Sequence, residues 1–465
     1  MHFDLTRRLL RAAGGLLPIS LLAAGGTATS SPALAQAARS TSDLVPLMTV
    51  GAVVHRQNPP SPADCYALFN RQITCYGPSD MAAEYNFNGA YSKGYNGAGQ
   101  TIVIFDSYGS PTIRQDLATF DRAYKLPAPP SFNIYYPEGK PVLNYQGLPS
   151  PANYNNKAIA TEVGWAYETT LDVEWAHAMA PGATIALVTV PVAETQGVQG
   201  LQNLENAQRW ALDNHIGNIW SDSFATTEQA FHTPASILGL NQLYAQADAA
   251  GITPLFASGD SGVLNTNLQG KVFPYPTVNY PSSSPNVLSV GGTQIEASDP
   301  PAPITSYHAE AVWNDGFGAG GGGFSAVFGE PSFQSTAGIS DTGGMRGLPD
   351  VSYNAAVISA VNIYESFDPV YGPGWVPIGG TSAATPQWAA VLAVVSQADG
   401  AQGFIAPKLY ALSTTSAYTS AFNDITSGNN SFGGIAGYSA GTGWDAASGL
   451  GTPNVAGLVS ALSTP

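Results

Sequence analysis

Short apolar, β-branched segments alternate with helical segments along most of this chain, and this alternation constrains the fold most strongly. The segments TIVIF (101–105) and ATIALVTV (183–190) are typical of buried strands, and helical patterns follow them over about 112–124 and 200–214. Further strands are expected at 217–223, 252–258 and 286–293, with a helical pattern over 234–250. Apolar strands separated by helices predict an α/β fold with a mostly parallel central sheet and helices on both faces.

The first 35 residues have the pattern of an export signal. Arg7, Arg8 and Arg11 precede an apolar stretch over 12–26, and the triplet ALA at 33–35 fits a cleavage site between small residues. We therefore expect residues 1–35 to be a signal peptide and the protein to be secreted, and the arginine pair is also compatible with twin-arginine export. No later apolar run is long enough to cross a membrane, so we expect no membrane partner after cleavage.

The charge of the chain argues against two classes of partner. The chain has 32 acidic and 16 basic residues and a net charge of −16, which argues against nucleic acid and anionic membrane surfaces as partners.

Residues 36–77 form a polar, proline-bearing lead-in segment in which Cys65 and Cys75 are expected to pair in a disulfide, as is usual in exported proteins. Residues 78–465 are expected to form one domain.

Ser382 stands where a nucleophilic serine is often found. It follows GGT in the segment GGTSAATPQWAAVLAVV (379–395), whose apolar remainder is of helix length. A helix N-terminus would favour negative charge developing beside Ser382. An ordinary helix-capping serine would look the same. No histidine, the usual base for such a serine, lies near it in sequence.

A pair of carboxylates could replace that histidine. Glu168 and Asp172 are four residues apart and share one face of the expected helix in YETTLDVEWAHAMAPGA (167–183). Apolar neighbours such as Leu171 and Trp175 predict that the pair titrates together with at least one raised pKa. The alternative is a solvated acidic face. His177 is five residues beyond Asp172 and is expected to be structural.

A third carboxylate occupies a tight turn after an expected strand. Asp260 lies in LFASGDSG (255–262), and the carboxyl ends of parallel strands are where α/β proteins bind ligands. The alternative is a turn aspartate that bonds its own backbone.

Together these segments resemble the sedolisins, or serine-carboxyl peptidases, a family related in fold to subtilisin. The marks of that family are a Glu-x-x-x-Asp pair, an aspartate in a Gly-Asp turn, and serine in Gly-Thr-Ser-Ala-x-x-Pro; here they are Glu168 with Asp172, Asp260 in SGDSG, and Ser382 in GTSAATP. The resemblance extends from about residue 78 to the C-terminus and implies a subtilisin-like fold and a catalytic domain over 78–465.

The resemblance also implies a mechanism. Glu168 would be the general base for Ser382, and Asp172 would orient Glu168 and raise its effective basicity. Ser382 would form an acyl-enzyme with the substrate. Asp260 replaces the oxyanion-hole asparagine of subtilisin, and because a carboxyl group donates a hydrogen bond only when protonated, activity is expected in acid.

A calcium ion is implied for the C-terminal region. The segments NDITSG (423–428) and GTGWDAASGLGTP (441–453) hold carboxylates among flexible glycines, and calcium prefers six to eight oxygen ligands. By resemblance the ligands would be the carboxylates of Asp424 and Asp445 and the carbonyl groups of Ile425, Gly441 and Gly443. Without the resemblance, the same stretch would be interpreted as a glycine-rich turn.

Some positions depart from the family. Asp106 falls where relatives extend the carboxylate network with glutamate, Phe224 falls where they often carry tryptophan, and Ala225 falls where they carry glycine. The run GAGGGGFSA (318–326) lacks the residues of a nucleotide-binding loop and is expected to be a loop on the substrate side.

The sequence therefore predicts a secreted, monomeric enzyme that acts on protein or peptide substrates. A peptide-binding protein without activity on the same scaffold is the alternative, and the presence of all four central residues argues against it. Endopeptidase and tripeptidyl-peptidase activities both occur in the family, and both remain open.

Overall fold

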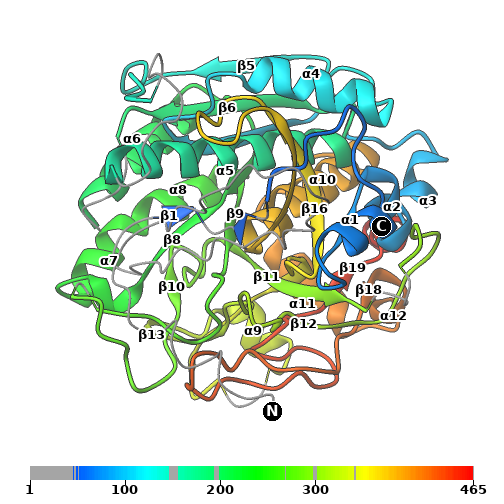
Figure 1. The fold of residues 1–465 in the computed structure, drawn as a ribbon. Helices are drawn as coiled ribbons and strands as arrows, with labels where there is room; N and C mark the ends of the chain where they lie inside the picture. Colours follow the sequence, from blue (N-terminus) through cyan, green and yellow to red (C-terminus); the bar gives the residue numbers. More distant parts are fainter. Residues whose placement is uncertain are drawn as a thin grey trace, which may run out of the picture.

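An eight-stranded, mostly parallel sheet forms the centre of the computed structural model (Figure 1). The structure describes residues 45–46, 49–50, 52–145, 156–192, 198–267, 269–296, 301–339 and 342–463; the expected signal peptide lies outside them. All neighbours in the sheet are parallel except β12, which is antiparallel to β11. The strand order is β12 (Glu310–Val312), β11 (Leu288–Ile295), β9 (Thr253–Ala257), β7 (Ile219–Asp222), β4 (Thr101–Ser107), β6 (Thr184–Val190) and β5 (Phe132–Tyr135), with β15 (Val351–Asn354) beside β11.

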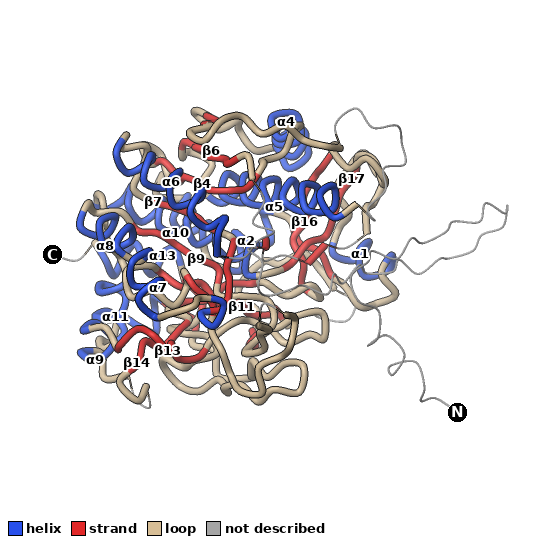
Figure 2. Tube along the Cα trace, turned by 90° about the vertical axis from the view of Figure 1, so that its left-hand side faces the viewer, coloured by secondary structure: helices blue, strands red, loops and turns tan. Residues whose placement is uncertain are grey.

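Helices cover both faces of this sheet, as the alternating pattern predicts. Alternate residues of β4 point to opposite faces: Ile102 and Ile104 pack in the core with α5 (Lys157–Met179) and α10 (Thr381–Asp399), while Val103 and Phe105 pack with α6 (Val198–Asp213) and α8 (Gln242–Ala249). Figure 2 shows β4 between α5 and α6. The mostly parallel sheet with helices on both faces is the expected subtilisin-like architecture.

The remaining helices lie around this core. The expected helix over 234–250 is two helices that meet at a turn at Asn241, whose side chain makes no capping hydrogen bond to the second helix. The helices that lie around the core are α1 (Pro62–Leu68), α2 (Pro78–Glu84), α3 (Phe87–Tyr91), α4 (Ile113–Tyr124), α7 (Pro234–Leu240), α9 (Ser332–Thr336), α11 (Ala406–Ser413), α12 (Tyr418–Ala421) and α13 (Val455–Leu462), together with a 3₁₀ turn, η1 (Glu228–Ala230). In the described part of the chain, no helix is both long and apolar enough to span a bilayer.

Among the described residues, four small sheets complete the fold. Two of them include strands from the lead-in segment, which the sequence pattern did not predict. Their strand orders are β1 (Val45–Pro46), β8 (Phe224–Thr227), β10 (Asn279–Tyr280); β2 (Thr49–Val50), β17 (Gly374–Gly379), β16 (Ser359–Glu365), β3 (Thr74–Tyr76); β13 (Gly323–Gly329) with β14 (Met345–Leu348); and β18 (Phe422–Asn423) with β19 (Thr452–Pro453).

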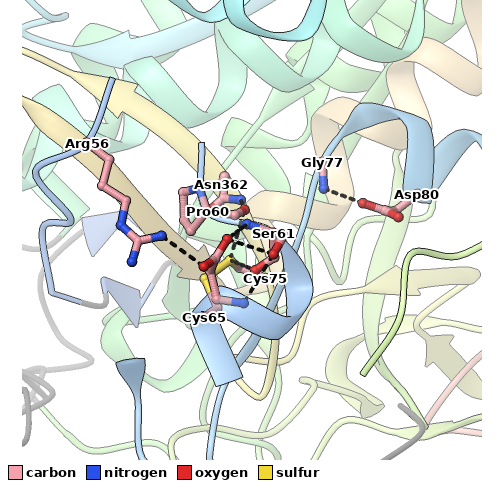
Figure 3. Close-up of a disulfide and its surroundings, with 9 residues drawn as sticks. Arg56, Pro60, Ser61, Cys65, Cys75, Gly77, Asp80 and Asn362 are labelled. Atoms are coloured by element: carbon pink, nitrogen blue, oxygen red, sulfur yellow. Dashed lines mark hydrogen bonds and ion pairs between the residues drawn. A yellow bond between two sulfur atoms is a disulfide. The ribbon is translucent and has the colours of Figure 1, made fainter. Parts of the chain in front are cut away.

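The structure forms the disulfide between Cys65 on α1 and Cys75 on β3 (Figure 3). Both half-cystines are buried, and Ser61 caps α1 by accepting a hydrogen bond from the Asp64 amide. The Asn362 amide on β16 donates to the carbonyl oxygen of Pro60 at 3.2 Å. These contacts fasten the lead-in to the β16–β17 hairpin.

Candidate active site

The long helix α5 carries Glu168 and Asp172. Both side chains are fully buried, so the alternative of a solvated acidic face is wrong. Asn156 caps the start of the helix by accepting a hydrogen bond from the Ala158 amide. Leu171 and Trp175 lie in the core beside the pair, so the helix turns its carboxylates inward together with its apolar residues.

Burial raises the pKa values of two carboxyl groups here, Asp172 and Asp106. Its pKa is raised well above the ordinary value because burial penalises the charged form and because the charges of Glu168 and Asp106 repel a further negative charge. Burial also raises the pKa of Asp106 to about 7, partly offset by a hydrogen bond from Thr169. Asp106 at the end of β4 therefore belongs electrostatically to this group of carboxyls.

Ser223 connects the carboxyl group of Asp172 to Ser382. Its hydroxyl donates to Asp172 Oδ1 at 3.0 Å, and its backbone carbonyl oxygen accepts a hydrogen bond from Ser382 Oγ at 3.3 Å. Ser223 directly follows β7, at the carboxyl end of a parallel strand. The sequence predicted only a strand over 217–223 here, although a serine at the carboxyl end of a parallel strand is a usable signal for a site residue.

Ser382 lies in the first turn of α10, as predicted. The preceding Gly380 has φ +127°, a backbone conformation that residues with a side chain rarely adopt, and its amide donates to the carbonyl oxygen of Ala355 at 2.6 Å. Ser382 has no exposed surface. The helix N-terminus therefore lies next to a buried hydroxyl.

Asp260 lies beside the same helix start. Its Oδ1 accepts hydrogen bonds from the backbone amide of Thr381, at 2.8 Å, and from the Thr381 hydroxyl, at 2.9 Å. The Thr381 hydroxyl in turn accepts a hydrogen bond from the amide of Gly259 at 3.1 Å. Asp260 therefore makes long-range contacts, and the alternative of a purely local turn aspartate is wrong. The role of Thr381 was not predicted.

The glycine-rich run lies against the Asp260 turn. The Gly321 amide donates to the carbonyl oxygen of Gly259 at 2.8 Å, and the Ala319 amide donates to that of Asp260 at 3.0 Å. A Cβ atom at Gly321 would collide with the backbone of Ser258, so only glycine allows this approach. The glycine-rich run therefore packs closely against the turn that carries Asp260.

A second polar group lies next to Ser223. Asp222 Oδ1 accepts a hydrogen bond from Gln208 Nε2 at 2.7 Å, and Tyr244 donates to Gln208 Oε1 at 3.2 Å. Burial raises the pKa of Asp222 well above its ordinary value. Nothing in the local sequence pattern predicted this arrangement, because its members come from β7, α6 and α8.

His177 lies near the end of α5, away from Ser382. Its Nε2 is 2.9 Å from the carbonyl oxygen of Pro127 and 3.3 Å from Asp121 Oδ1, so its contacts are with α4 and the loop after it. This location agrees with a structural histidine.

The two C-terminal carboxylates meet at one glycine turn. Asp424 accepts hydrogen bonds from the Gly443 amide at 3.1 and 3.0 Å, and Asp445 Oδ2 accepts one from the Gly441 amide at 3.0 Å. In the described part of the chain, no three histidine, cysteine or acidic side chains lie close enough to hold a metal. Two carboxylates with several backbone carbonyl oxygens would be a donor set suited to a hard cation, and such a set does not need a third acidic side chain.

Comparison with models of protein families shows which family the chain belongs to. The model of the subtilase family matches residues 152–449, which include all four central residues. The chain belongs to the subtilase family. The subtilases are serine-type peptidases, and the matched region includes α5 with Glu168 and Asp172, the turn after β9 with Asp260, and α10 with Ser382.

Within the subtilases, the similarity is to the sedolisins. Kumamolisin from Bacillus sp. (strain MN-32) is 33% identical over 400 residues, which are 84% of this chain and 64% of kumamolisin. Sedolisin from Pseudomonas sp. (strain 101) is 35% identical over 275 residues, which are 57% of this chain and 44% of sedolisin. The chain is a sedolisin-family member that spans only part of the length of these curated relatives.

A solved structure of Pseudomonas sedolisin, complexed with two molecules of pseudo-iodotyrostatin, superimposes on this fold. Its TM-score is 0.66 at 29% identity, and the match covers 83% of this chain and 97% of that one. The subtilisin-like fold predicted from the resemblance is therefore confirmed.

Proposed function

We propose that this subtilase is a secreted, acid-acting serine-carboxyl peptidase that hydrolyses peptide bonds through an acyl-enzyme on Ser382. The observation that carries the proposal is that Ser223 contacts both Asp172, through its hydroxyl, and Ser382 Oγ, through its backbone carbonyl, while Asp260 is held at the adjacent Thr381. A carboxylate base and a carboxylic-acid donor can together replace the histidine and asparagine of a subtilisin.

Glu168 takes the proton of the Ser382 hydroxyl as the nucleophile attacks the peptide carbonyl, and later gives it to the leaving amine. Asp172, one helical turn away, orients Glu168. Its raised pKa means that Asp172 holds a proton in acid and can donate it in a hydrogen bond to its ionised neighbour. The pair thus shares one proton when the base is active.

Protonated Asp260 and the Ser382 backbone amide stabilise the oxyanion. Because Oδ1 of Asp260 already accepts two hydrogen bonds from Thr381, the proton that faces the substrate belongs on Oδ2. Ionisation of this group replaces a donor with a negative charge, so the proposal requires activity to fall as pH rises.

Calcium is part of the proposal as a structural ion. Asp424, Asp445 and the carbonyl groups of Ile425, Gly441 and Gly443 would hold it. When bound, the ion supplies positive charge that cross-links the C-terminal glycine turns. It has no role in the chemistry at Ser382.

The test is digestion of a denatured protein from acidic to neutral pH, with mass spectrometry of the fragments. Ser382→Ala should lower the rate by roughly 10³-fold or more, because it removes the nucleophile. Ser396→Ala, a buried serine elsewhere on α10, is the matched control and should keep the activity. A Ser382→Ala protein with full activity would exclude the mechanism, and a wild type that binds peptides without cutting them would favour the binding-protein alternative. The fragments also distinguish endopeptidase from tripeptidyl-peptidase cleavage.

A further inference from the structure

The turn that carries Asp260 is held by a side chain from one of the small sheets. Asn279 lies on β10, and its Nδ2 donates a hydrogen bond to the carbonyl oxygen of Ser258 at 3.0 Å. A carbonyl oxygen can only accept, so the amide nitrogen of Asn279, and not its amide oxygen, faces Ser258. The same nitrogen lies against Gly259, where an added Cβ atom would be 2.3 Å from it. Asn279 therefore packs against both residues that precede Asp260.

The strand that carries Asn279 is itself well anchored. β10 is antiparallel to β8, with Asn279 opposite Thr227 (Figure 1). The carbonyl oxygen of Asn279 accepts a hydrogen bond from the Ser283 amide at 2.9 Å. The next residue, Tyr280, is fully buried, and its ring centroid is 5.4 Å from that of Phe231. The position of the amide nitrogen is thus fixed by the strand behind it.

Asp260 is thereby attached to the nucleophile by two routes. The first runs through Thr381, which precedes Ser382 and donates to Asp260 Oδ1. The second starts at Ser223, whose carbonyl oxygen accepts a hydrogen bond from Ser382 Oγ. It continues along β8, which begins directly after Ser223, and crosses to β10 and Asn279. The acid that would face the oxyanion is therefore supported from two directions.

The Ser258 carbonyl oxygen depends on the donor from β10. Ser258 is buried, so bulk water does not simply replace a hydrogen bond that is lost there. Without the donor the turn would shift toward another partner, and Asp260, two residues further on, would shift with it. A displacement of about 1 Å at a catalytic group can slow a reaction by about 10²-fold.

We propose that Asn279 is a positioning residue that sets where Asp260 lies relative to the oxyanion, by holding Ser258 and Gly259 from β10. The inference rests on the proposed peptidase function and adds a residue that acts through Asp260 without touching the substrate. Because the oxyanion forms only as the peptide bond is attacked, loss of Asn279 should lower kcat and leave KM nearly unchanged.

Asn279→Leu is the first test, because leucine has a similar size and no donor. With a quenched fluorogenic peptide taken from a cut site of the digested protein, kcat should fall by about tenfold at the acidic optimum and KM should change by less than about twofold. Asn214→Leu is the matched control, since Asn214 Nδ2 donates to the carbonyl oxygen of Trp210 at 2.8 Å at the end of α6. That variant should keep its kcat. A folded Asn279→Leu protein with wild-type kcat would overturn the proposal.

A double variant tests whether Asn279 acts through Asp260. Asn279→Leu added to Asp260→Ala should cause less than about twofold further loss of kcat, because the acid that it positions is already gone. A further tenfold loss, about as large as in the wild-type background, would show that Asn279 acts on another group and would overturn the proposal.

Asn279→Asp keeps the question open to test if the leucine variant does not fold. In acid the introduced carboxyl is protonated and can still donate to the Ser258 carbonyl oxygen, so kcat should stay within about threefold of the wild type. When this carboxyl ionises, it repels the carbonyl oxygen, so the alkaline limit of activity should move to lower pH. A limit that moves to higher pH would show that the new charge merely keeps Asp260 protonated, against the proposal.

Hydrogen exchange adds a readout that does not depend on activity. The amides of Gly259 and Thr381 donate within the hydrogen bonds of the turn, so both should exchange roughly tenfold faster in Asn279→Leu. Faster exchange with an unchanged kcat would overturn the positioning role. A wild type without activity that depends on Ser382 would overturn both proposals. An active wild type, with kcat and exchange both unchanged in Asn279→Leu, would overturn only the role of Asn279.

Discussion

Thr381 donates both its backbone amide and its hydroxyl to Oδ1 of Asp260. Since Thr381 directly precedes Ser382, these two bonds attach the turn after β9 to the N-terminus of α10. The position of the acid that would face the oxyanion is thus fixed by the neighbour of the nucleophile. The role proposed for Asp260 as an oxyanion donor depends on these two hydrogen bonds from Thr381.

Asp260→Asn should move the alkaline limit of activity to higher pH. The amide oxygen can still accept both bonds from Thr381, and the amide nitrogen donates whatever the pH. Asp260→Ala should instead lower kcat by about 10²–10³-fold, because an oxyanion donor is lost. Profiles of kcat against pH for the three proteins test this, and a wild-type profile in Asp260→Ala would exclude the assigned role.

Ser223→Ala should lower kcat by about tenfold or more with little change in KM. The substitution removes a hydrogen bond that lowers the pKa of Asp172, so that pKa should rise further and the kcat–pH profile should shift upward. The backbone carbonyl that contacts Ser382 remains. An unchanged profile, with Ser396→Ala as the reference, would show that Ser223 does not act through Asp172.

The fold should lose stability as pH rises above about 4.5. Burial raises the pKa of Glu84 and of Glu365 to about 9, and that of Glu205 to about 8. These groups are protonated in the folded state while the unfolded chain is already ionised, so the unfolded state binds fewer protons. Their stabilising contribution is therefore complete below the unfolded pKa and is lost as pH rises toward 8 or 9.

Thermal unfolding between acidic and alkaline pH measures this loss as a falling Tm. Glu365→Gln should flatten the dependence, because the amide stays neutral, whereas the exposed Glu296→Gln should not. A Tm that rises from acidic to neutral pH would contradict the argument.

Gly259→Ala should destabilise the protein by roughly 1–3 kcal/mol. Gly259 has φ +125°, and a Cβ atom there would collide with the side-chain Nδ2 of the buried Asn279. Gly239→Ala on α7 is the control, since that position has open space and a helix favours alanine. Urea unfolding of both variants gives the comparison; equal stability for both would contradict the steric argument.

Calcium should raise the Tm of the wild type and not that of Asp424→Asn. Asp424 and Asp445 face one glycine turn, and an ion between them would replace hydrogen bonds to backbone amides with direct coordination. Asp213→Asn, an exposed carboxylate on α6, should respond to calcium as the wild type does. Chelation without any change in wild-type Tm would exclude the site.

Local patterns predicted five of the eight strands of the central sheet, namely β4, β6, β7, β9 and β11, and the start of a helix next to Ser382. They also selected the carboxylates of α5, because apolar neighbours at helical spacing indicated burial. They could not predict Ser223 or Thr381 as partners, since those contacts join residues far apart in sequence. The strands of the lead-in were missed for a related reason: two-residue strands have no periodicity, and only their partners β8 and β17 make them strands.

The anchoring of the lead-in has a consequence for unfolding. Val54 exchanges two backbone hydrogen bonds with Trp375, at 2.7 and 3.0 Å, and the disulfide between Cys65 and Cys75 closes the chain soon after it. The lead-in can therefore separate from the rest of the chain only after its strand pairing with β16 and β17 is broken.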